Sequence, residues 1–536
     1  MPDAVFLNGT LLTLDPRRPA AQALAVRGER LLAVGSNAAI AALARPHTRC
    51  VDLHGRFVLP GFHDAHLHLL ALGRSRSTLD LRPAHSLEDL QARLARFAQA
   101  LPPAAWIVGS GWDQSGWPQA RLPERRDLDP FCGGRPAFLE RIDLHAAVVN
   151  SAAVQAAGIG RETKPPPGGE IVRDAAGEST GLLLEDARTL VRRLLPPPRP
   201  DDTRRALSRA LAEAAAVGIT SVQDYSGWEA FLELERLRAA EELPVRVREW
   251  LDFRLPLETL RAQRAHHPAA DAWLATGMLK AFLDGSLGSR TAALLTPYAD
   301  APHTSGLLQY DPGELIALAV ERVRAGFQLG FHAIGDRAAR LALDVFAAAA
   351  AAAPTMPPPR IEHLQVLDPA DLPRLRSLGV IASIQPSHLL DDRRWAEARL
   401  GPERRASAYP WQSLLRAGLP LAFGSDAPVA GLHPGLGLFA ALDRPGRNGP
   451  EGFPPAAERI SLAAALRAYT SGGALAEGTE RDKGSLTPGQ LADFAVWSHD
   501  LRTLAPEDLP NARALLTVAG GRAVHVAPDW EQEVRQ

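Results

Sequence analysis

The order of apolar and polar positions predicts a chain that begins and ends in short strands. Near the start, short apolar or alternating runs are separated by turn signals such as Asn8-Gly9, which is typical of an antiparallel unit. Similar runs return near the other end, where Gly520-Gly521 separates the last two. We therefore expect residues 1–56 and 485–536 to form one small composite β-sandwich.

The middle of the chain, residues 57–484, alternates between strand-length apolar runs and segments with helical periodicity. This alternation is the pattern of a parallel (β/α)8 barrel, in which each strand is followed by a helix. The expected barrel strands are Phe57–Pro60, Gly218–Gln223, Pro244–Arg248, Met278–Leu283, Gln328–His332, Arg360–Leu364, Val380–Gln385 and Leu421–Gly424.

The interval between the first two expected strands is much longer than a barrel connection needs. It predicts an inserted subdomain of about residues 70–217, with proline-rich loops at 165–169 and 196–198. The expected fold class is therefore α/β: a TIM-like (β/α)8 barrel, a small β-sandwich built from both termini, and a large insertion after the first barrel strand.

The composition excludes several functional classes. Lys and Arg number 59 against 61 Asp and Glu, so the net charge of −2 gives no footprint for nucleic acid or an anionic membrane. Two cysteines exclude a disulfide framework and a cysteine-rich zinc module. The first residues lack the pattern of a signal peptide, and no apolar run reaches the ~18 residues of a membrane span. We expect a soluble, cytoplasmic protein that acts on a small molecule.

Lysine is rare in this chain, with only three among the 59 basic residues. One of the three, Lys280, lies within an expected apolar strand. A lysine is seldom buried without a partner. One interpretation is a buried ion pair with Asp284. The other is a neutral amine that takes up CO2 and becomes a carbamate able to bridge two metals, which a guanidinium cannot do because it is not deprotonated in proteins.

Histidines and one aspartate follow the strand ends, where barrel enzymes carry their chemistry. His66 and His68 are two positions apart in an extended segment, so they face the same way, and imidazole is a common zinc ligand. A core or surface role explains any one of these residues, but explains the ordered set poorly. The ordered set is His66, His68, Lys280, His332, His363 and Asp426.

With this ordered set, the chain resembles the amidohydrolase superfamily of metal-dependent hydrolases. More narrowly, it is similar to the branch that contains N-substituted formamide deformylase, through Gly-Trp-Asp-Gln at 111–114, Arg-Ile-Asp-Leu-His at 141–145 and Asp-Gly-Ser-Leu-Gly-Ser-Arg-Thr at 284–291. Two positions depart from the family pattern. His63 stands where an apolar residue is usual, and Leu144 replaces a common glycine.

The resemblance implies a site with paired metal ligands. His66 and His68 would bind the more buried metal, His332 and His363 the second, and carbamylated Lys280 would bridge the two. A divalent metal, with zinc expected and one or two ions per chain, fits imidazole and carboxylate ligands.

The resemblance also implies the reaction, which is hydrolysis of a non-peptide C–N bond in an N-substituted amide or a formamide-like substrate. Metal-activated hydroxide would attack the carbonyl, and Asp426, also a ligand of the first metal, would pass the proton to the leaving amine. A homodimer is the expected assembly.

Further residues are expected around the metals. The substrate contacts expected are Trp112, His145, Arg290 and His388, with His145 also a catalytic candidate. A structural role is the alternative for His145. The residues expected to hold ligating histidines through their second nitrogen are Asp284, Asp336 and Glu362.

Three other functions remain open at this point. The same metal site could hydrolyse an ester, a lactone or a cyclic amide. A metal-free enzyme could act through a Schiff base on Lys280, but it would leave the histidines without roles. A non-catalytic ligand-binding protein would be expected to lack some of the ligands.

Overall fold

The computed structural model divides the chain into two compact units, residues 1–70 with 207–536 and residues 71–206. It describes residues 1–76, 78–102, 105–114, 117–118, 121–141, 146–166, 169–196, 200–444, 453 and 455–530. Among the helices within these ranges, none combines the length and apolarity needed to cross a bilayer.

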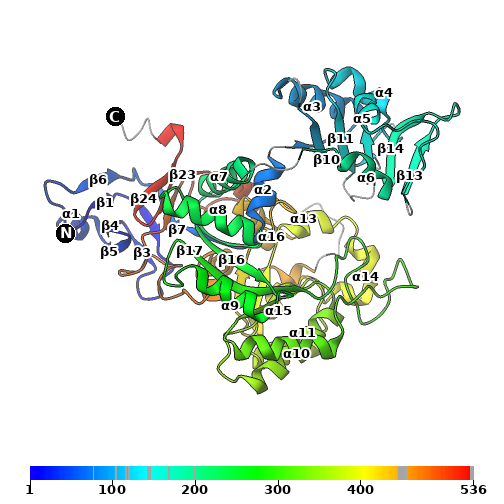
Figure 1. Ribbon diagram of the computed structural model, residues 1–536. Coiled ribbons are helices and arrows are strands. Elements are labelled where there is room, and N and C mark those ends of the chain that lie inside the picture. Colours follow the sequence, from blue (N-terminus) through cyan, green and yellow to red (C-terminus); the bar gives the residue numbers. More distant parts are fainter. Residues whose placement is uncertain are drawn as a thin grey trace. The chain divides into compact units, whose positions relative to one another are not determined.

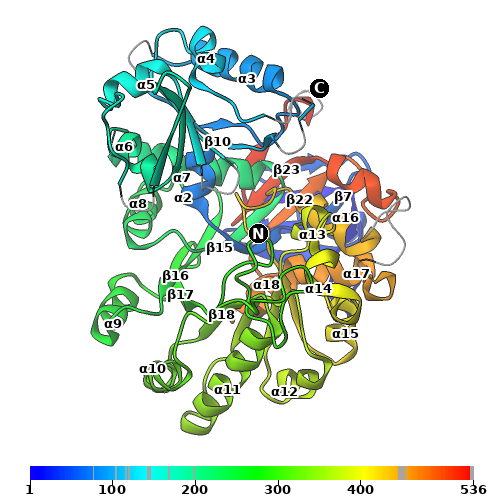
Figure 2. The ribbon, with the colours of Figure 1, turned by 90° about the vertical axis from the view of Figure 1, so that its right-hand side faces the viewer.

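Parallel strands form a barrel at the centre of the first unit (Figures 1 and 2). In spatial order they are β8 (Phe62–Leu67), β15 (Ile219–Asp224), β16 (Arg246–Asp252), β17 (Leu274–Phe282), β18 (Leu329–Ala333), β19 (Arg360–His363), β20 (Ile381–Ile384) and β21 (Leu421–Phe423). The loop after β21 meets the first strand, because the Asp426 N–H donates to the His66 carbonyl at 2.7 Å. The predicted (β/α)8 fold class is therefore confirmed.

The first barrel strand differs from the prediction. Phe57–Pro60 forms β7, which pairs with β2 (Thr10–Leu12) and β22 (Phe494–Trp497) in a separate sheet, and the barrel begins only with β8. Gly61 joins the two strands, and a Cβ there would lie 2.2 Å from the Thr220 hydroxyl. Phe57–Pro60 is a strand-length apolar run directly before the histidine segment, and the local pattern carries no sign that the chain changes sheets at Gly61.

Two small sheets draw on both ends of the chain. One has the order β5 (Arg30–Gly35), β4 (Ala23–Arg27), β1 (Ala4–Leu7) and β6 (Arg49–Asp52). The other has the order β24 (Arg522–Val526), β23 (Ala514–Ala519), β22, β7, β2 and β3 (Ala20–Ala21). They share a buried apolar cluster in which Phe6 and Phe494 meet edge to face, at 5.0 Å between ring centroids. The apolar residues of the strands at both termini are thus buried in one common core.

Helices surround the barrel and bury one face each (Figure 2). In α10 (Pro312–Arg324), the Asp311 side chain caps the first turn by accepting from the Gly313 and Glu314 amides, and buried residues recur every three or four positions. The other barrel helices named below or in the figures are α7 (Pro200–Ala216), α8 (Trp228–Ala239), α9 (Leu257–His266), α11 (Asp336–Ala352), α12 (Leu372–Ser377), α13 (His388–Asp392), α14 (Ala396–Arg405) and α15 (Trp411–Arg416). These are followed by α16 (Pro434–Asp443), α17 (Leu462–Arg467) and α18 (Gly473–Ala476).

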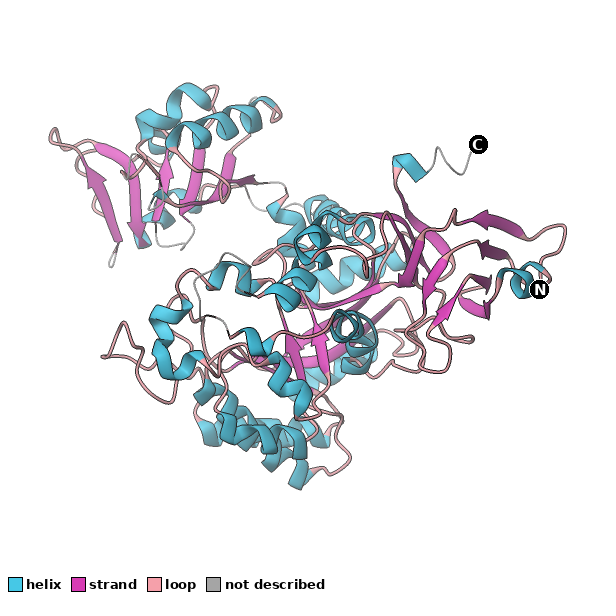
Figure 3. Ribbon diagram, turned by 180° about the vertical axis from the view of Figure 1, so that it is seen from behind, coloured by secondary structure: helices cyan, strands magenta, loops and turns pink. Residues whose placement is uncertain are grey.

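The second unit is a mixed sheet with helices packed against it (Figure 3). Its strand order is β13 (Gly169–Arg173), β14 (Ser179–Glu185), β12 (Ala146–Val149), β11 (Ala137–Arg141), β10 (Ile107–Trp112) and β9 (Leu79–Asp80). It has apolar clusters of its own, one of which contains Trp112 and Trp117. This explains why so long an insertion between two barrel strands is stable: it buries its own core.

Candidate metal centre

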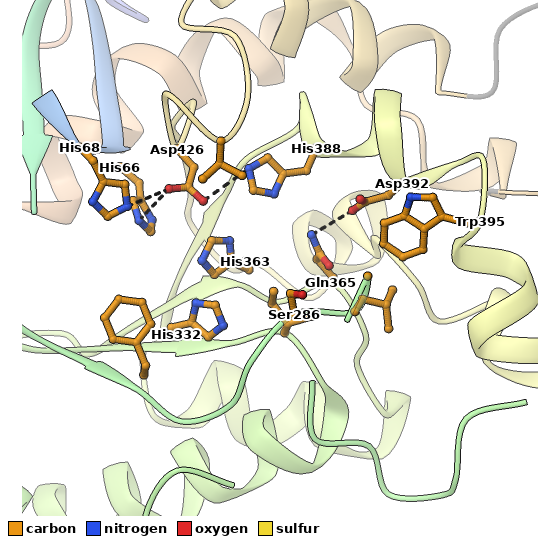
Figure 4. Close-up of a pocket in the computed structure, with 15 residues that line it drawn as sticks. His66, His68, Ser286, His332, His363, Gln365, His388, Asp392, Trp395 and Asp426 are labelled. Carbon is orange, nitrogen blue, oxygen red and sulfur yellow. Dashed lines mark hydrogen bonds and ion pairs between the residues drawn. The ribbon is translucent and has the colours of Figure 1, made fainter. Parts of the chain in front are cut away.

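His66 and His68 lie at the end of β8, and each has one ring nitrogen held by a partner. His66 Nδ1 lies 2.8 Å from Glu362 Oε2, and His68 Nδ1 lies 2.8 Å from the Tyr225 carbonyl. An oxygen acceptor places the proton on Nδ1 and leaves the Nε2 lone pair available. Both Nε2 atoms face Asp426 Oδ1, at 3.5 Å from His66 and 3.0 Å from His68 (Figure 4). The three side chains form one group of possible metal ligands.

Asp426 also belongs to a second group of possible ligands, with His363 and His388. Asp426 Oδ2 lies 3.5 Å from His388 Nε2, and the ligand atoms of this group all lie within 4.8 Å of one another. His363 is at the end of β19, whereas His388 begins α13. From the sequence, His388 was expected to bind substrate. Its place among the possible ligands could not be predicted from strand ends, because His388 lies on a helix.

His332 lies next to His363, with 4.4 Å between ring centroids. Its Nε2 contacts the Gly285 carbonyl at 3.1 Å and Asp284 Oδ1 at 3.4 Å, which leaves Nδ1 on the other side of the ring. The Asp284 carboxylate itself accepts the backbone N–H groups of Ala293, Ile334 and Gly335 at 2.8–3.1 Å. Asp284 is therefore a backbone anchor that also touches the His332 ring.

Lys280 is 1% exposed, and within the described residues its Nζ has no hydrogen-bond partner. The amine lies 5.2 Å from the Trp250 ring centroid and 5.0 Å from that of Phe282. The ion pair with Asp284 considered from the sequence is absent among these residues, because backbone amides occupy that carboxylate. Burial lowers the pKa of Lys280 to about 8, against the opposing effect of Glu362 and Asp426. A neutral amine is thus within reach at physiological pH.

Buried nitrogens without hydrogen-bond partners gather at this end of the barrel. Within the described residues they are Lys280 Nζ, His332 Nδ1, His363 Nδ1 and His388 Nε2. Buried polar atoms are normally paired, and unpaired ones carry a desolvation cost. Imidazole nitrogens around a shared carboxylate are the donors that zinc and related divalent metals prefer. The residues present therefore fit a bound divalent metal.

The protonation states suit this purpose. Burial lowers the pKa of His66 to about 4 and of His332 to about 3, and it holds the pKa of His363 well below the usual range. These imidazoles are neutral at pH 7 and can offer lone pairs. Although burial opposes it, the surrounding histidines, among them the hydrogen-bonded His68, hold the pKa of Asp426 well below that of an ordinary carboxyl. Asp426 is therefore an anion at neutral pH.

Arg360 and Glu362 support the first histidine from within the barrel. Arg360 Nε donates to Glu362 Oε1 at 2.6 Å, and both side chains are fully buried. Arg360 also donates to Gln223 Oε1, to the Ala65 carbonyl at 2.7 Å and to Ser383 Oγ at 2.9 Å. Against the effect of burial, Arg360 and His66 hold the pKa of Glu362 far below its usual value. The ionised carboxylate thus fixes the His66 ring.

The remaining predicted site residues lie elsewhere. Trp112 is fully buried in the core of the second unit, where its Nε1–H donates to the Leu139 carbonyl at 2.8 Å, so it is not available to a substrate. Arg290 pairs with Asp300 at 2.8 Å at a partly exposed position. Asp336 accepts the backbone N–H groups of Leu295 and Arg337 rather than touching a histidine. His145 lies outside the described residues.

A cavity of about 350 Å³ opens at the metal-ligand groups (Figure 4). One side carries the five histidines and Asp426 described above. The other walls are apolar, with Phe282, Leu287, Ile334, Trp395 and Val429 beside Gly288, and the lining also includes the polar residues Ser286, Gln365 and Asp392. None of these three polar residues was expected at the site from the sequence. The cavity combines an apolar body with a few polar groups, as small-molecule sites do.

Known proteins resemble this chain over nearly its whole length. A model of the Amidohydrolase family matches residues 49–525. LONG AFTER FAR-RED 3 of Arabidopsis thaliana is 35% identical over 98% of this chain and 91% of its own length. The N-substituted formamide deformylase of Arthrobacter pascens is 28% identical over 97% of this chain and 98% of its own. The crystal structure of an uncharacterized metal-dependent hydrolase from Pyrococcus horikoshii matches with a TM-score of 0.76 at 28% identity, and it covers 94% of this chain and 99% of that one. With the ligand groups of the barrel, these similarities establish that the chain belongs to the amidohydrolase family.

Proposed function

We propose that this chain hydrolyses the C–N bond of an N-substituted amide or formamide, with zinc as its metal. The observation that carries the proposal is the group of imidazoles around one carboxylate in a cavity with apolar walls. A C–N bond is the chosen target because the relative named N-substituted formamide deformylase matches this chain almost end to end.

The residues that would hold metal are the two groups that share Asp426, with His332 beside them. A divalent metal bound there supplies a Lewis acid and a water of lowered pKa. Lys280 has the burial and the lowered pKa that carbamylation of its amine requires, so we propose it as a further oxygen ligand. The Glu362–Arg360 pair holds His66 with its Nε2 directed to Asp426.

Asp426 is the group best placed to move the proton. It is ionised, lies between His68 and His388, and lines the cavity. It can accept a proton from the attacking water and return it to the nitrogen of the leaving amine, which is general base followed by general acid catalysis. His388 Nε2 lies 3.5 Å from Asp426 Oδ2 and can hold this carboxylate in position.

The apolar walls indicate the kind of substrate. Phe282, Leu287 and Trp395 can enclose an alkyl or aromatic substituent on the amide nitrogen while the carbonyl lies over the histidines. Such enclosure also excludes bulk water from the reacting carbonyl.

The decisive experiment joins metal analysis to a substrate panel. Purified protein should contain stoichiometric zinc, and N-formyl and N-acyl amines should be hydrolysed faster than matched esters, lactones and cyclic amides. Asp426→Asn serves as the control for a contaminating hydrolase. Full activity after careful removal of metal would overturn the mechanism, and turnover of esters or lactones alone would overturn the choice of bond.

A further inference from the structure

The short helix α13 presents two polar side chains to the same cavity. His388 and Asp392 are four residues apart, so they lie on the same face of the helix, and both line the cavity (Figure 4). Four residues correspond to a rise of about 6 Å along a helix axis. His388 contacts Asp426, so the Asp392 carboxylate is a second polar group of the cavity, about one helical turn away from the possible metal ligands.

Among the described residues, hydrogen-bond partners of Asp392 reach only one of its two carboxylate oxygens. The Tyr409 hydroxyl donates to Oδ2 at 2.6 Å, and Gln365 Nε2 donates to the same oxygen at 3.2 Å. Within the described residues, Oδ1 receives no hydrogen bond, and Gln365 Oε1 receives none either. This end of the cavity therefore offers hydrogen-bond acceptors and calls for a ligand rich in N–H donors.

Among the described residues, no arginine or lysine forms an ion pair with Asp392. Its neighbour Arg394 lies 3.8 Å from Asp391 instead, on the exposed side of the helix. Burial raises the pKa of Asp392, while His388 and the Tyr409 bond oppose that shift. A partly buried carboxylate without a cation is costly unless a ligand supplies the positive charge.

An aromatic wall stands beside this carboxylate. Trp395 lines the cavity next to Asp392 (Figure 4), and an indole ring attracts cations through its π face. Arg399 lies 5.1 Å from the Trp395 ring centroid and pairs with Asp300 at 2.6 Å, a carboxylate that it shares with Arg290. Leu287 and Phe282 provide apolar surface elsewhere in the same cavity.

We propose that Asp392 determines specificity by binding an ammonium group of the substrate, placed about one helical turn from the bond that is hydrolysed. The substrate class is therefore an amide or formamide whose nitrogen substituent is a short alkyl chain that ends in a primary amine. The inference rests on the proposed amidohydrolase function for the reacting end of the substrate. It adds the recognition of the other end.

The test compares two substrates of equal length, N-formylputrescine and N-formylpentylamine, which differ in an ammonium against a methyl group. The wild-type protein should prefer the cationic compound in kcat/KM. Asp392→Asn should lower kcat/KM for N-formylputrescine by about tenfold to a hundredfold, the value of a hydrogen bond to a charged group. It should leave N-formylpentylamine within about twofold. Asp391→Asn, on the exposed side of the same helix, is the matched control and should change neither value.

A binding measurement separates this inference from the proposed function. Calorimetric titration with butylamine, which is an ammonium ion at neutral pH, should show binding to the wild-type protein that Asp392→Asn loses and Asp391→Asn keeps. If that pattern appears but no amide is hydrolysed, the ammonium site stands and the proposed function falls. Equal rates for the two formamides in the wild-type protein, or unchanged butylamine binding in Asp392→Asn, would overturn the inference, and the wild-type comparison needs no folded variant.

Discussion

The two ends of the barrel each hold a buried lysine, and the two lysines have opposite surroundings. Near the amino ends of the strands, Lys483 Nζ lies 2.7 Å from Glu477 Oε1 and donates to Ser221 Oγ at 2.9 Å. Near the carboxyl ends, Lys280 has no such partner among the described residues. The Lys483 amine is paired by the protein itself, whereas the Lys280 amine is available to a bound group.

The histidines on β8 repeat this contrast. His63 lies near the start of the strand and contacts Glu477 at 3.5 Å and the Gln223 amide at 3.0 Å. His66, three residues later, has its Nδ1 held by Glu362 while its Nε2 faces the other metal ligands. The unusual histidine at position 63 therefore has a structural partner in Glu477. His63 thus supports the fold through Glu477, whereas His66 keeps its Nε2 directed at the other possible metal ligands.

The largest effect is expected at Lys280. Lys280→Arg keeps the charge but cannot form a carbamate, and it places a fixed positive charge beside the metal ligands. We expect a folded protein without measurable turnover and with reduced zinc, determined by steady-state kinetics, circular dichroism and metal analysis. Lys483→Arg, the matched change at the other end, should keep its zinc. Near wild-type activity of Lys280→Arg would show that Lys280 is only structural.

Asp426→Asn should follow in size. The amide keeps the shape but cannot accept a proton, and loss of general acid–base catalysis costs about 10²–10⁴-fold in kcat. Pre-steady-state and steady-state assays with the best formamide substrate measure it, with zinc content determined in parallel. A variant that kept the wild-type kcat would transfer the proton-moving role to His388.

Lys483→Met should act on stability rather than on the site. It leaves Glu477 buried without its closest cation, and breaking a buried pair costs about 3–5 kcal/mol in the free energy of unfolding. Urea unfolding followed by tryptophan fluorescence measures the loss, and the double variant with Glu477→Gln should recover part of it. Loss of zinc from the folded Lys483→Met protein would contradict the assignment of Lys483 to stability and of Lys280 to the metal site.

The smallest effect is expected between the two ends, at Glu362. Glu362→Gln weakens the fixation of His66 and should lower zinc affinity about 10–100-fold, as changes behind metal-ligating histidines do. Competition with a chromogenic chelator measures the affinity without relying on turnover. Asp336→Asn is the control, since Asp336 contacts backbone amides rather than a histidine. Equal affinities for the Glu362 variant and the wild-type protein would contradict the role of Glu362.

The barrel was predictable because its strands are short apolar runs separated by amphipathic helices. The error at Phe57–Pro60 arose where two strands adjoin and only long-range pairing decides the sheet. His66, His68, His363 and Asp426 could be grouped from the sequence because strand ends converge in this fold, and the structure places them among the possible metal ligands.

Other site assignments depended on partners that are distant in sequence. The local motif at Trp112 could not reveal the core that encloses it. Asp392 could not be distinguished from the other acidic residues by sequence, because its role depends on the cavity and on hydrogen bonds that reach only Oδ2 among the described residues.

Arg360 has a consequence for how the barrel assembles. Its guanidinium bonds to β8, β15, β19 and β20 at once, through Ala65, Gln223, Glu362 and Ser383. Segments 295 residues apart must therefore be in place before this buried cation has all its partners, and any partial barrel would leave the cation unpaired or expose the barrel interior to water. Arg360 makes the barrel cooperative: half-barrels produced by fragmentation should not persist as folded species, and the metal ligands should form only in the last step of closure.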